Sequence, residues 1–91
     1  MPSPVEIVIY TTQSCPYCRM AKDLLRSRNL AYDEICVDAD FEARAEMMQR
    51  AQGNRTVPQI FFGDRHIGGC EELYELDASG QLDALLSDLA R

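Results

Sequence analysis

Two cysteines separated by two residues are the strongest chemical signal in this sequence. Cys15 and Cys18 lie in the segment Cys-Pro-Tyr-Cys, whereas Cys36 and Cys70 are isolated. Thiol–disulfide exchange needs such a pair, because an exposed thiolate attacks a disulfide and a second nearby thiol resolves the product. A disulfide across so short a loop adds little stability through chain entropy. The spacing therefore favours a pair that changes redox state over a structural crosslink.

A helix beginning at Pro16 would make the two sulfur atoms chemically different. Proline suits the first helical position, which puts Cys15 at the N-cap, where free backbone N–H groups and the helix dipole stabilise a thiolate. Arg19 and Lys22 follow on the same helix and add positive charge. Cys18 falls in the first turn, closer to the protein interior. We therefore expect Cys15 to be the attacking nucleophile and Cys18 to be the resolving thiol.

Half of a zinc site is the alternative interpretation of this pair. Structural zinc takes four ligands, and the remaining candidates, Cys36, Cys70 and His66, do not supply a second close pair. Pro16 also fits a helix start better than a zinc knuckle. We therefore expect no metal site.

The pattern of apolar residues predicts an α/β fold with the element order βαβαββα. The first two strands flank a helix, which favours a parallel pair with a right-handed crossover. Gly63-Asp64 separates two apolar runs and predicts a hairpin. Gly80 divides the last helical region in two. Strands are expected over residues 6–10, 31–37, 59–62 and 65–67, and helices from 16 to about 29, from 41 to about 51, from 70 to about 79 and over 82–89.

Length, composition and charge limit the possible functions. The chain has 91 residues, of which 46% are hydrophobic and 26% are charged, and no repeat or linker divides it. These values predict one domain over residues 1–91, with no membrane-spanning or secretion segment, and a cytoplasmic location. The net charge of −6 makes nucleic acids and anionic membranes poor partners. Most of this acidity follows Cys70. We expect the protein to act as a monomer.

Three motifs in order resemble those of the dithiol glutaredoxins, in particular the small bacterial ones. They are Cys-Pro-Tyr-Cys at residues 15–18, Thr-Val-Pro-Gln at 56–59 and Ile-Gly-Gly-Cys at 67–70, the last followed by acidic residues. The match runs from about Ile7 to Leu86. It implies a thioredoxin fold, with a four-stranded mixed sheet in the order 4-3-1-2 flanked by helices. It also implies glutathione as a co-substrate and no tightly bound cofactor.

The resemblance implies a glutathione site opposite the cysteine pair. Pro58 would be cis, although a proline bond taken by itself favours trans, and the Val57 backbone would pair with an extended thiol peptide. The γ-glutamyl end would meet the start of a helix, while Tyr17 would flank the sulfur. Arg55 would meet the glycyl carboxylate or remain a solvated surface residue. The implied binding residues are Tyr17, Arg55, Thr56, Val57, Pro58, Gly69, Cys70 and Glu71.

This sequence departs from the family in the loop before the cysteine pair. Many relatives carry a lysine there, whereas this chain has Thr12 and Gln13, which puts in doubt how strongly the thiolate and glutathione are held. Of the isolated cysteines, Cys36 is expected to be a small buried residue. Cys70 is expected to be a packed spectator, with slow oxidation or glutathionylation as the alternative. We expect His66 to be partly exposed.

The implied activity is glutathione-dependent reduction of protein–glutathione mixed disulfides and protein disulfides, with ribonucleotide reductase as one candidate partner. A thioredoxin-type reductant is the enzymatic alternative, but the chain has no tryptophan beside its cysteine pair. A different function would be an iron–sulfur carrier, in which Cys15 and glutathione from two copies hold a cluster. Pro16 stiffens the loop and counts against that function, and a colourless protein after anaerobic purification would exclude it further.

Overall fold

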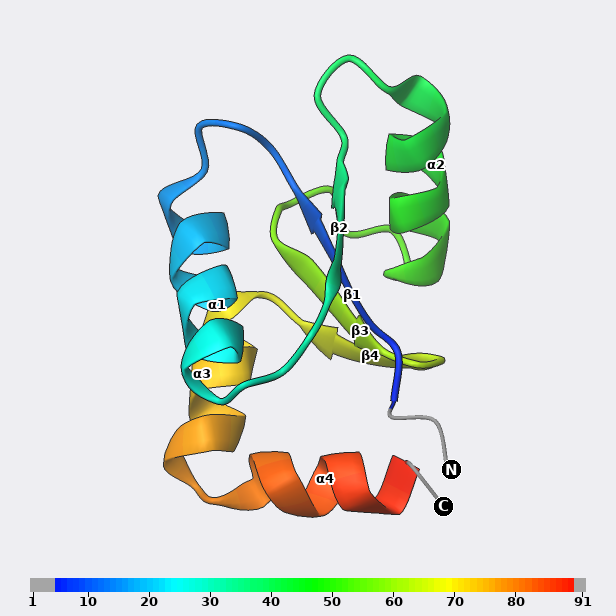
Figure 1. Ribbon diagram of the computed structural model, residues 1–91. Coiled ribbons are helices and arrows are strands. Elements are labelled where there is room, and N and C mark those ends of the chain that lie inside the picture. The colour runs from blue at the N-terminus through cyan, green and yellow to red at the C-terminus, as the bar shows by residue number, and fades with distance from the viewer. Residues whose placement is uncertain (1–4, 90–91) are drawn as a thin grey trace.

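The computed structural model describes residues 5–89, and its strands and helices follow the predicted order. The expected last helical region consists of two helices that meet at Gly80, whose φ angle is 74°. Figure 1 shows the elements, which are β1 (Ile7–Thr11), α1 (Pro16–Ser27), β2 (Asp33–Cys36), α2 (Phe41–Arg50), β3 (Gln59–Phe62), β4 (Arg65–Gly68), α3 (Cys70–Ala78) and α4 (Gln81–Leu89).

The strands form one mixed sheet in the order β2-β1-β3-β4, which is the predicted order read from the opposite edge. β1 is parallel to β2, with Val8 opposite Asp33. It is antiparallel to β3, which forms the predicted hairpin with β4. The two central strands, β1 and β3, consist entirely of buried residues. The loop before α1 follows β1 and the loop before β3 leads into β3, so these two buried strands fix the positions of both loops.

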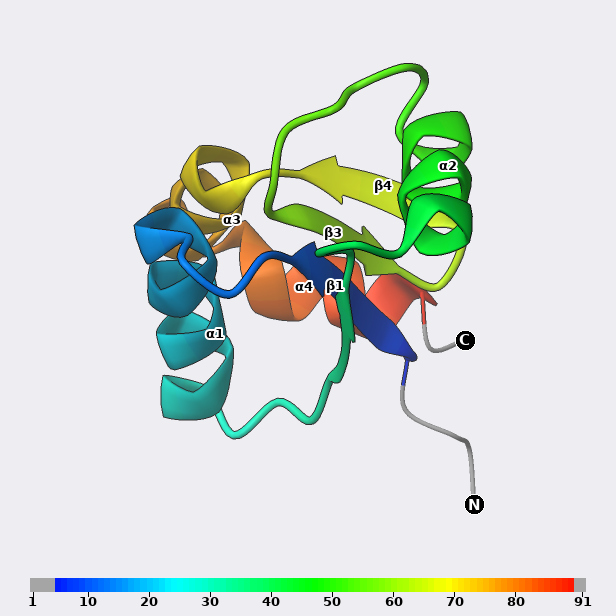
Figure 2. The same ribbon diagram turned by 90° about the horizontal axis from the view of Figure 1, so that it is seen from above.

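Alternating residues of β1 enter two different cores, because successive side chains of a strand point to opposite faces of the sheet. Ile7 and Ile9 pack with residues of α1, α3 and α4. Val8 and Tyr10 pack on the other face against α2, where Met47 is fully buried. Figure 2 shows the same division, with α2 alone on its side of the sheet. The arrangement brings the N-terminal ends of α1 and α3 to the same side of the sheet.

The junction between β4 and α3 requires glycine. Gly68 has a φ angle of 118°, and a Cβ at this position would lie 2.6 Å from Glu72 Oε1. The same carboxylate oxygen accepts a hydrogen bond from the Gly69 N–H at 2.7 Å. A Cβ on Gly69 would lie 3.3 Å from the carbonyl oxygen of Pro58. The start of α3 therefore packs closely against the loop that precedes β3.

Two expectations about the second strand were wrong. It covers Asp33–Cys36 rather than residues 31–37, and Cys36 is exposed rather than buried. The reason is that β2 is an edge strand of the sheet. Cys36 lies at its end and lines an open depression with polar neighbours such as Gln13 and Glu34, which leaves its side chain exposed to solvent.

Within residues 5–89, none of the helices combines the length and the apolar character needed to cross a bilayer.

Candidate functional site

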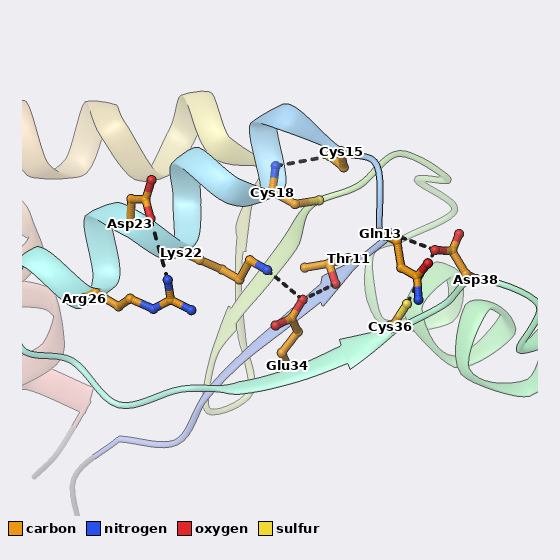
Figure 3. A network of polar contacts seen from close by, with 10 residues as sticks. All are labelled: Thr11, Gln13, Cys15, Cys18, Lys22, Asp23, Arg26, Glu34, Cys36 and Asp38. Carbon is orange, nitrogen blue, oxygen red and sulfur yellow. Dashed lines mark hydrogen bonds and ion pairs between the residues drawn. The ribbon is translucent and has the colours of Figure 1, made fainter.

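The sulfur of Cys15 caps the first helix, as the position of Pro16 predicted. The backbone of Cys15 is extended, with φ −103° and ψ 106°, and α1 begins at the next residue. The backbone N–H of Cys18 donates a hydrogen bond to Cys15 Sγ at 3.1 Å. Figure 3 shows this contact at the head of the helix. A sulfur that accepts a helical N–H, at the positive end of the helix dipole, is stabilised as an anion.

The second cysteine of the pair lies in a different environment. Cys18 is 1% exposed, whereas Cys15 is partly exposed. Burial raises the pKa of the Cys18 thiol to about 12, and its interaction with the Cys15 side chain adds to the increase. Cys18 is therefore a neutral thiol in the reduced protein at neutral pH. Of the two sulfur atoms, only that of Cys15 is both accessible to solvent and the acceptor of a helical N–H.

A polar network that the sequence analysis missed links α1 to β2 below the pair. Lys22 Nζ donates to Glu34 Oε2 at 3.0 Å, and Thr11 Oγ1 donates to the same oxygen at 2.6 Å (Figure 3). The hydrogen bond from Thr11 is the main reason that the pKa of Glu34 is lowered, and Lys22 contributes further. Lys22 is four residues after Cys18 and shares its face of the helix. The signal in the sequence for this network was Thr11, a polar residue at the end of the apolar strand β1.

The loop before Cys15 is held by a carboxylate. Asp38 Oδ2 accepts a hydrogen bond from the Gln13 N–H at 2.7 Å, and the Cys36 thiol donates to the same oxygen at 3.6 Å. The backbone of Gln13, and not its side chain, makes this contact. The loop is thus anchored through the segment that follows β2.

The loop before β3 forms the opposite wall of the site. The Val57–Pro58 peptide bond is cis, which confirms the expectation drawn from the family resemblance. In its thiol form, Cys15 donates to the carbonyl oxygen of Val57 at 3.7 Å. Within residues 5–89, no hydrogen bond uses the Val57 N–H. A backbone edge with one unused donor therefore lies beside the reactive sulfur.

A buried glutamine holds this wall in place. Gln59 is 3% exposed, and its Nε2 donates to Thr56 O at 3.0 Å and to Thr56 Oγ1 at 3.1 Å. Its Oε1 lies 2.6 Å from His66 Nε2, and because Gln59 already donates to Thr56, His66 must be the donor in this contact. His66 is half-buried, as expected, and it stacks on Phe61 with the ring centres 4.9 Å apart.

The third wall is the start of α3. Cys70 is 7% exposed, in agreement with a packed residue. Burial raises its pKa, with further contributions from the negative charges of Cys15 and Glu72. Tyr17 and Glu71 are exposed and line one groove together with Cys70. The structure thus brings these three predicted residues together.

Arg55 directly precedes Thr56 in the loop before β3. Its side chain is exposed, and among residues 5–89 it forms no ion pair. In the same part of the chain, no three side chains of the His, Cys, Asp and Glu types are arranged to hold a metal ion. The contacts of Cys15 with the Cys18 N–H and with the Val57 carbonyl place an accessible sulfur, a second thiol and a backbone edge side by side.

Comparison with known proteins supports this chemistry. The glutaredoxin family model matches residues 7–67. A glutaredoxin of Pseudomonas aeruginosa is 51% identical over 81 residues, which cover 89% of this chain and 95% of the relative. The solution structure of a Brucella melitensis glutaredoxin aligns with a TM-score of 0.79 and 49% identity, over 92% of this chain and 90% of the other.

A buckwheat glutaredoxin provides a structural neighbour solved in complex with glutathione. It aligns with a TM-score of 0.80 and 31% identity, over 92% of this chain and 78% of the other. These structural neighbours confirm the thioredoxin fold implied by the three motifs.

Proposed function

Because the chain belongs to the glutaredoxin family, and is therefore a thiol–disulfide oxidoreductase, we propose that glutathione is its reductant and that Cys15 is its nucleophile. Its substrates are protein–glutathione mixed disulfides and protein disulfides. One observation carries the proposal: the partly exposed Cys15 sulfur accepts a helical N–H at 3.1 Å beside the backbone edge of Val57. An anion is stabilised there with room for an extended thiol peptide.

The reduction of a glutathionylated protein uses Cys15 alone. Its thiolate attacks the sulfur of glutathione in the mixed disulfide, a new S–S bond forms, and the protein leaves as a thiolate that takes a proton from solvent. The thiolate of a second glutathione then attacks the bound glutathione sulfur. This step releases glutathione disulfide and restores the Cys15 thiolate. In total, one glutathione thiol is oxidised as the protein sulfur is reduced, and the glutathione removed from the protein becomes the other half of glutathione disulfide.

The reduction of a protein disulfide also uses Cys18. Cys15 attacks one substrate sulfur and the other leaves as a thiolate. Cys18 then loses its proton and attacks Cys15 Sγ, so that the Cys15–Cys18 disulfide forms and the second substrate thiol is released. Because the pKa of Cys18 is raised to about 12, its proton must leave as it attacks. The first substrate thiolate to be released can accept it. Two glutathione molecules then reduce the pair.

The walls of the site support the assignment of a glutathione site. The unused Val57 N–H and the Val57 carbonyl group suit a cysteinyl backbone that pairs as an added strand. At the start of α3, the free N–H groups suit the γ-glutamyl carboxylate, and Glu71 suits its ammonium group. Tyr17 would cover the sulfur. Thr56 and Pro58 shape the loop between these positions, and Arg55 would reach the glycyl carboxylate.

Cysteine variants test the proposal in an assay coupled to glutathione reductase and NADPH. Cys15→Ser should abolish the reduction of both substrate types. Cys18→Ser should retain deglutathionylation and lose the reduction of protein disulfides. Cys36→Ser removes an exposed thiol outside the site and is the matched control, so it should keep both activities. Deglutathionylation by the Cys15 variant, or turnover with thioredoxin reductase but not with glutathione, would reject the proposal.

A further inference from the structure

An apolar groove with acidic residues along it lies between α1 and α3, beside the reactive cysteine. Three of its side chains are large, apolar and solvent-exposed: Tyr17 is 63% exposed, Met20 44% and Tyr74 38%. Within residues 5–89 only Phe41 and Leu89 are further members of this class. The groove is lined by Tyr17, Met20, Cys70, Glu71, Tyr74, Glu75 and Ala78. Such a concentration of exposed apolar surface marks an interaction site.

The groove is preformed, and one of its lining residues, Cys70, lies close enough to Cys15 for the two side chains to interact electrostatically. The hydroxyl group of Tyr74 donates to the carbonyl oxygen of Met20 at 3.1 Å, which ties α3 to α1 across the floor of the groove. Tyr17 lies two residues after Cys15, and Cys70 forms the start of α3. A polypeptide whose disulfide reaches Cys15 therefore has its neighbouring residues within reach of the groove.

The charge beside the groove is negative. α3 contains four acidic residues and no basic one in the sequence CEELYELDA. Glu71 and Glu75 line the groove, and neither forms an ion pair within residues 5–89. In the described part of the chain, no basic residue lines the groove. Among the cations of α1 and its C-terminal end, Lys22 and Arg26 are paired with acids outside α3, and Arg28 is paired with Asp77.

We propose that this groove binds the residues that flank the reactive cysteine of a protein disulfide, and that it selects flanks carrying an apolar side chain together with lysine or arginine. This inference rests on the proposed function and adds the chemical class of substrate. The apolar side chain covers Met20 and Tyr74, and the cation lies beside Glu75. Opposite charges placed at the edge of an apolar contact favour such a partner and disfavour an acidic one.

Peptide disulfides that differ only beside the cysteine test the inference. The basic peptide carries Leu and Lys next to its disulfide, the acidic peptide carries Leu and Glu, and the third carries Ser and Lys. The wild-type protein should reduce the basic peptide with a kcat/KM about three- to tenfold higher than that of the acidic peptide, the range expected for one or two exposed ion pairs. The kcat/KM for the Ser-Lys peptide should be lower than that for the Leu-Lys peptide. The charge preference should shrink at high salt.

A charge reversal locates the preference in the groove. Glu75→Lys should invert the ratio of kcat/KM between the basic and acidic peptides. Glu46→Lys makes the same charge change at an exposed residue of α2, on the other face of the sheet, and should leave the wild-type ratio in place. Equal ratios in the wild type and in the Glu75 variant would overturn the inference.

A small substrate separates this inference from the proposed function. The mixed disulfide of glutathione and 2-mercaptoethanol has no polypeptide flank, so its turnover by the wild-type protein reports the glutathione-dependent reaction alone. If the wild-type protein turns over this substrate but does not discriminate among the peptides, the proposed role of the groove is wrong and the proposed function stands. If the wild-type protein does not turn over this substrate, both proposals are wrong.

Discussion

The backbone N–H of Cys18 donates a hydrogen bond to the sulfur of Cys15 at 3.1 Å. One residue thus donates to the sulfur of its partner, while its own thiol is 1% exposed and keeps its proton because its pKa is raised. The donor is a backbone group, so the contact can survive replacement of the Cys18 side chain by any residue except proline. The roles of nucleophile and resolving thiol can therefore be separated by substitution.

The raised pKa of Cys18 predicts a specific loss of stability at alkaline pH. The pKa is about 12 in the folded protein, against an ordinary value of 9.0. Between these values the unfolded chain releases the proton and the folded chain retains it. The free energy of unfolding of the reduced protein should therefore fall as the pH rises from about 9 to about 12.

Denaturant unfolding of the reduced wild type and of Cys18→Ala at several pH values measures this effect. Other groups titrate in the same range, so the quantity to compare is the difference between the two proteins. That difference should change with pH only above about 9. A difference that is constant up to pH 12 would show that Cys18 titrates normally.

Asp38 should control the reactivity of Cys15 without touching substrate. Its carboxylate accepts the Gln13 N–H at 2.7 Å and anchors the loop that precedes the nucleophile. Asp38→Ala removes the acceptor and should slow alkylation of Cys15 by iodoacetamide by about two- to fivefold, because loss of one exposed hydrogen bond costs about 0.5–1 kcal/mol. Asp38→Asn retains an acceptor oxygen and should react like the wild type. A Cys36→Ser background prevents alkylation of the exposed Cys36. Equal rates in all three proteins would contradict the anchoring role.

His66 should act on substrate binding through Gln59. His66→Phe keeps an aromatic ring to stack on Phe61 but removes the donor to Gln59 Oε1, which leaves a buried acceptor unsatisfied at a cost of about 1–3 kcal/mol. The loop of residues 56–58 should loosen. We expect the KM for a glutathionylated peptide to rise severalfold with a smaller change in kcat.

Two further variants complete the test of His66. His66→Asn supplies an amide donor and should recover part of the wild-type KM, whereas Arg65→Gln changes a neighbouring exposed residue and should leave KM unaltered. A lower thermal stability of His66→Phe with an unchanged KM would mean that the histidine supports only the fold.

Gly68 should tolerate substitution less well than another glycine with positive φ. Gly68→Ala forces a Cβ to within 2.6 Å of Glu72 Oε1, the oxygen that accepts the Gly69 N–H. We expect a loss of about 2–4 kcal/mol, because the clash adds to the cost of the left-handed backbone. Gly53 has a φ angle of 91° with open space around it, so Gly53→Ala should lower the free energy of unfolding by about 1 kcal/mol. Urea denaturation gives both values, and equal losses would show that Glu72 moves aside freely.

The sequence by itself determined the features that depend on neighbouring residues. Pro16 starts a helix and places Cys15 at its N-cap because capping acts over three or four residues. Apolar runs and the Gly63-Asp64 turn predicted the strands and the hairpin for the same local reason. The family motifs added the strand order and the cis bond before Pro58. Cys36 was misjudged because the apolar pattern of a strand does not reveal whether that strand lies at the edge of the sheet.

Only the tertiary structure decided which distant residues meet. Val57 reaches Cys15 across 42 positions of the chain, and Tyr74 reaches Met20 across 54. Such contacts depend on strand order and helix packing, which no local pattern of residues encodes. The charge and shape of the groove between α1 and α3 follow from that packing, because residues of two helices far apart in the sequence supply its apolar floor and its acidic edge.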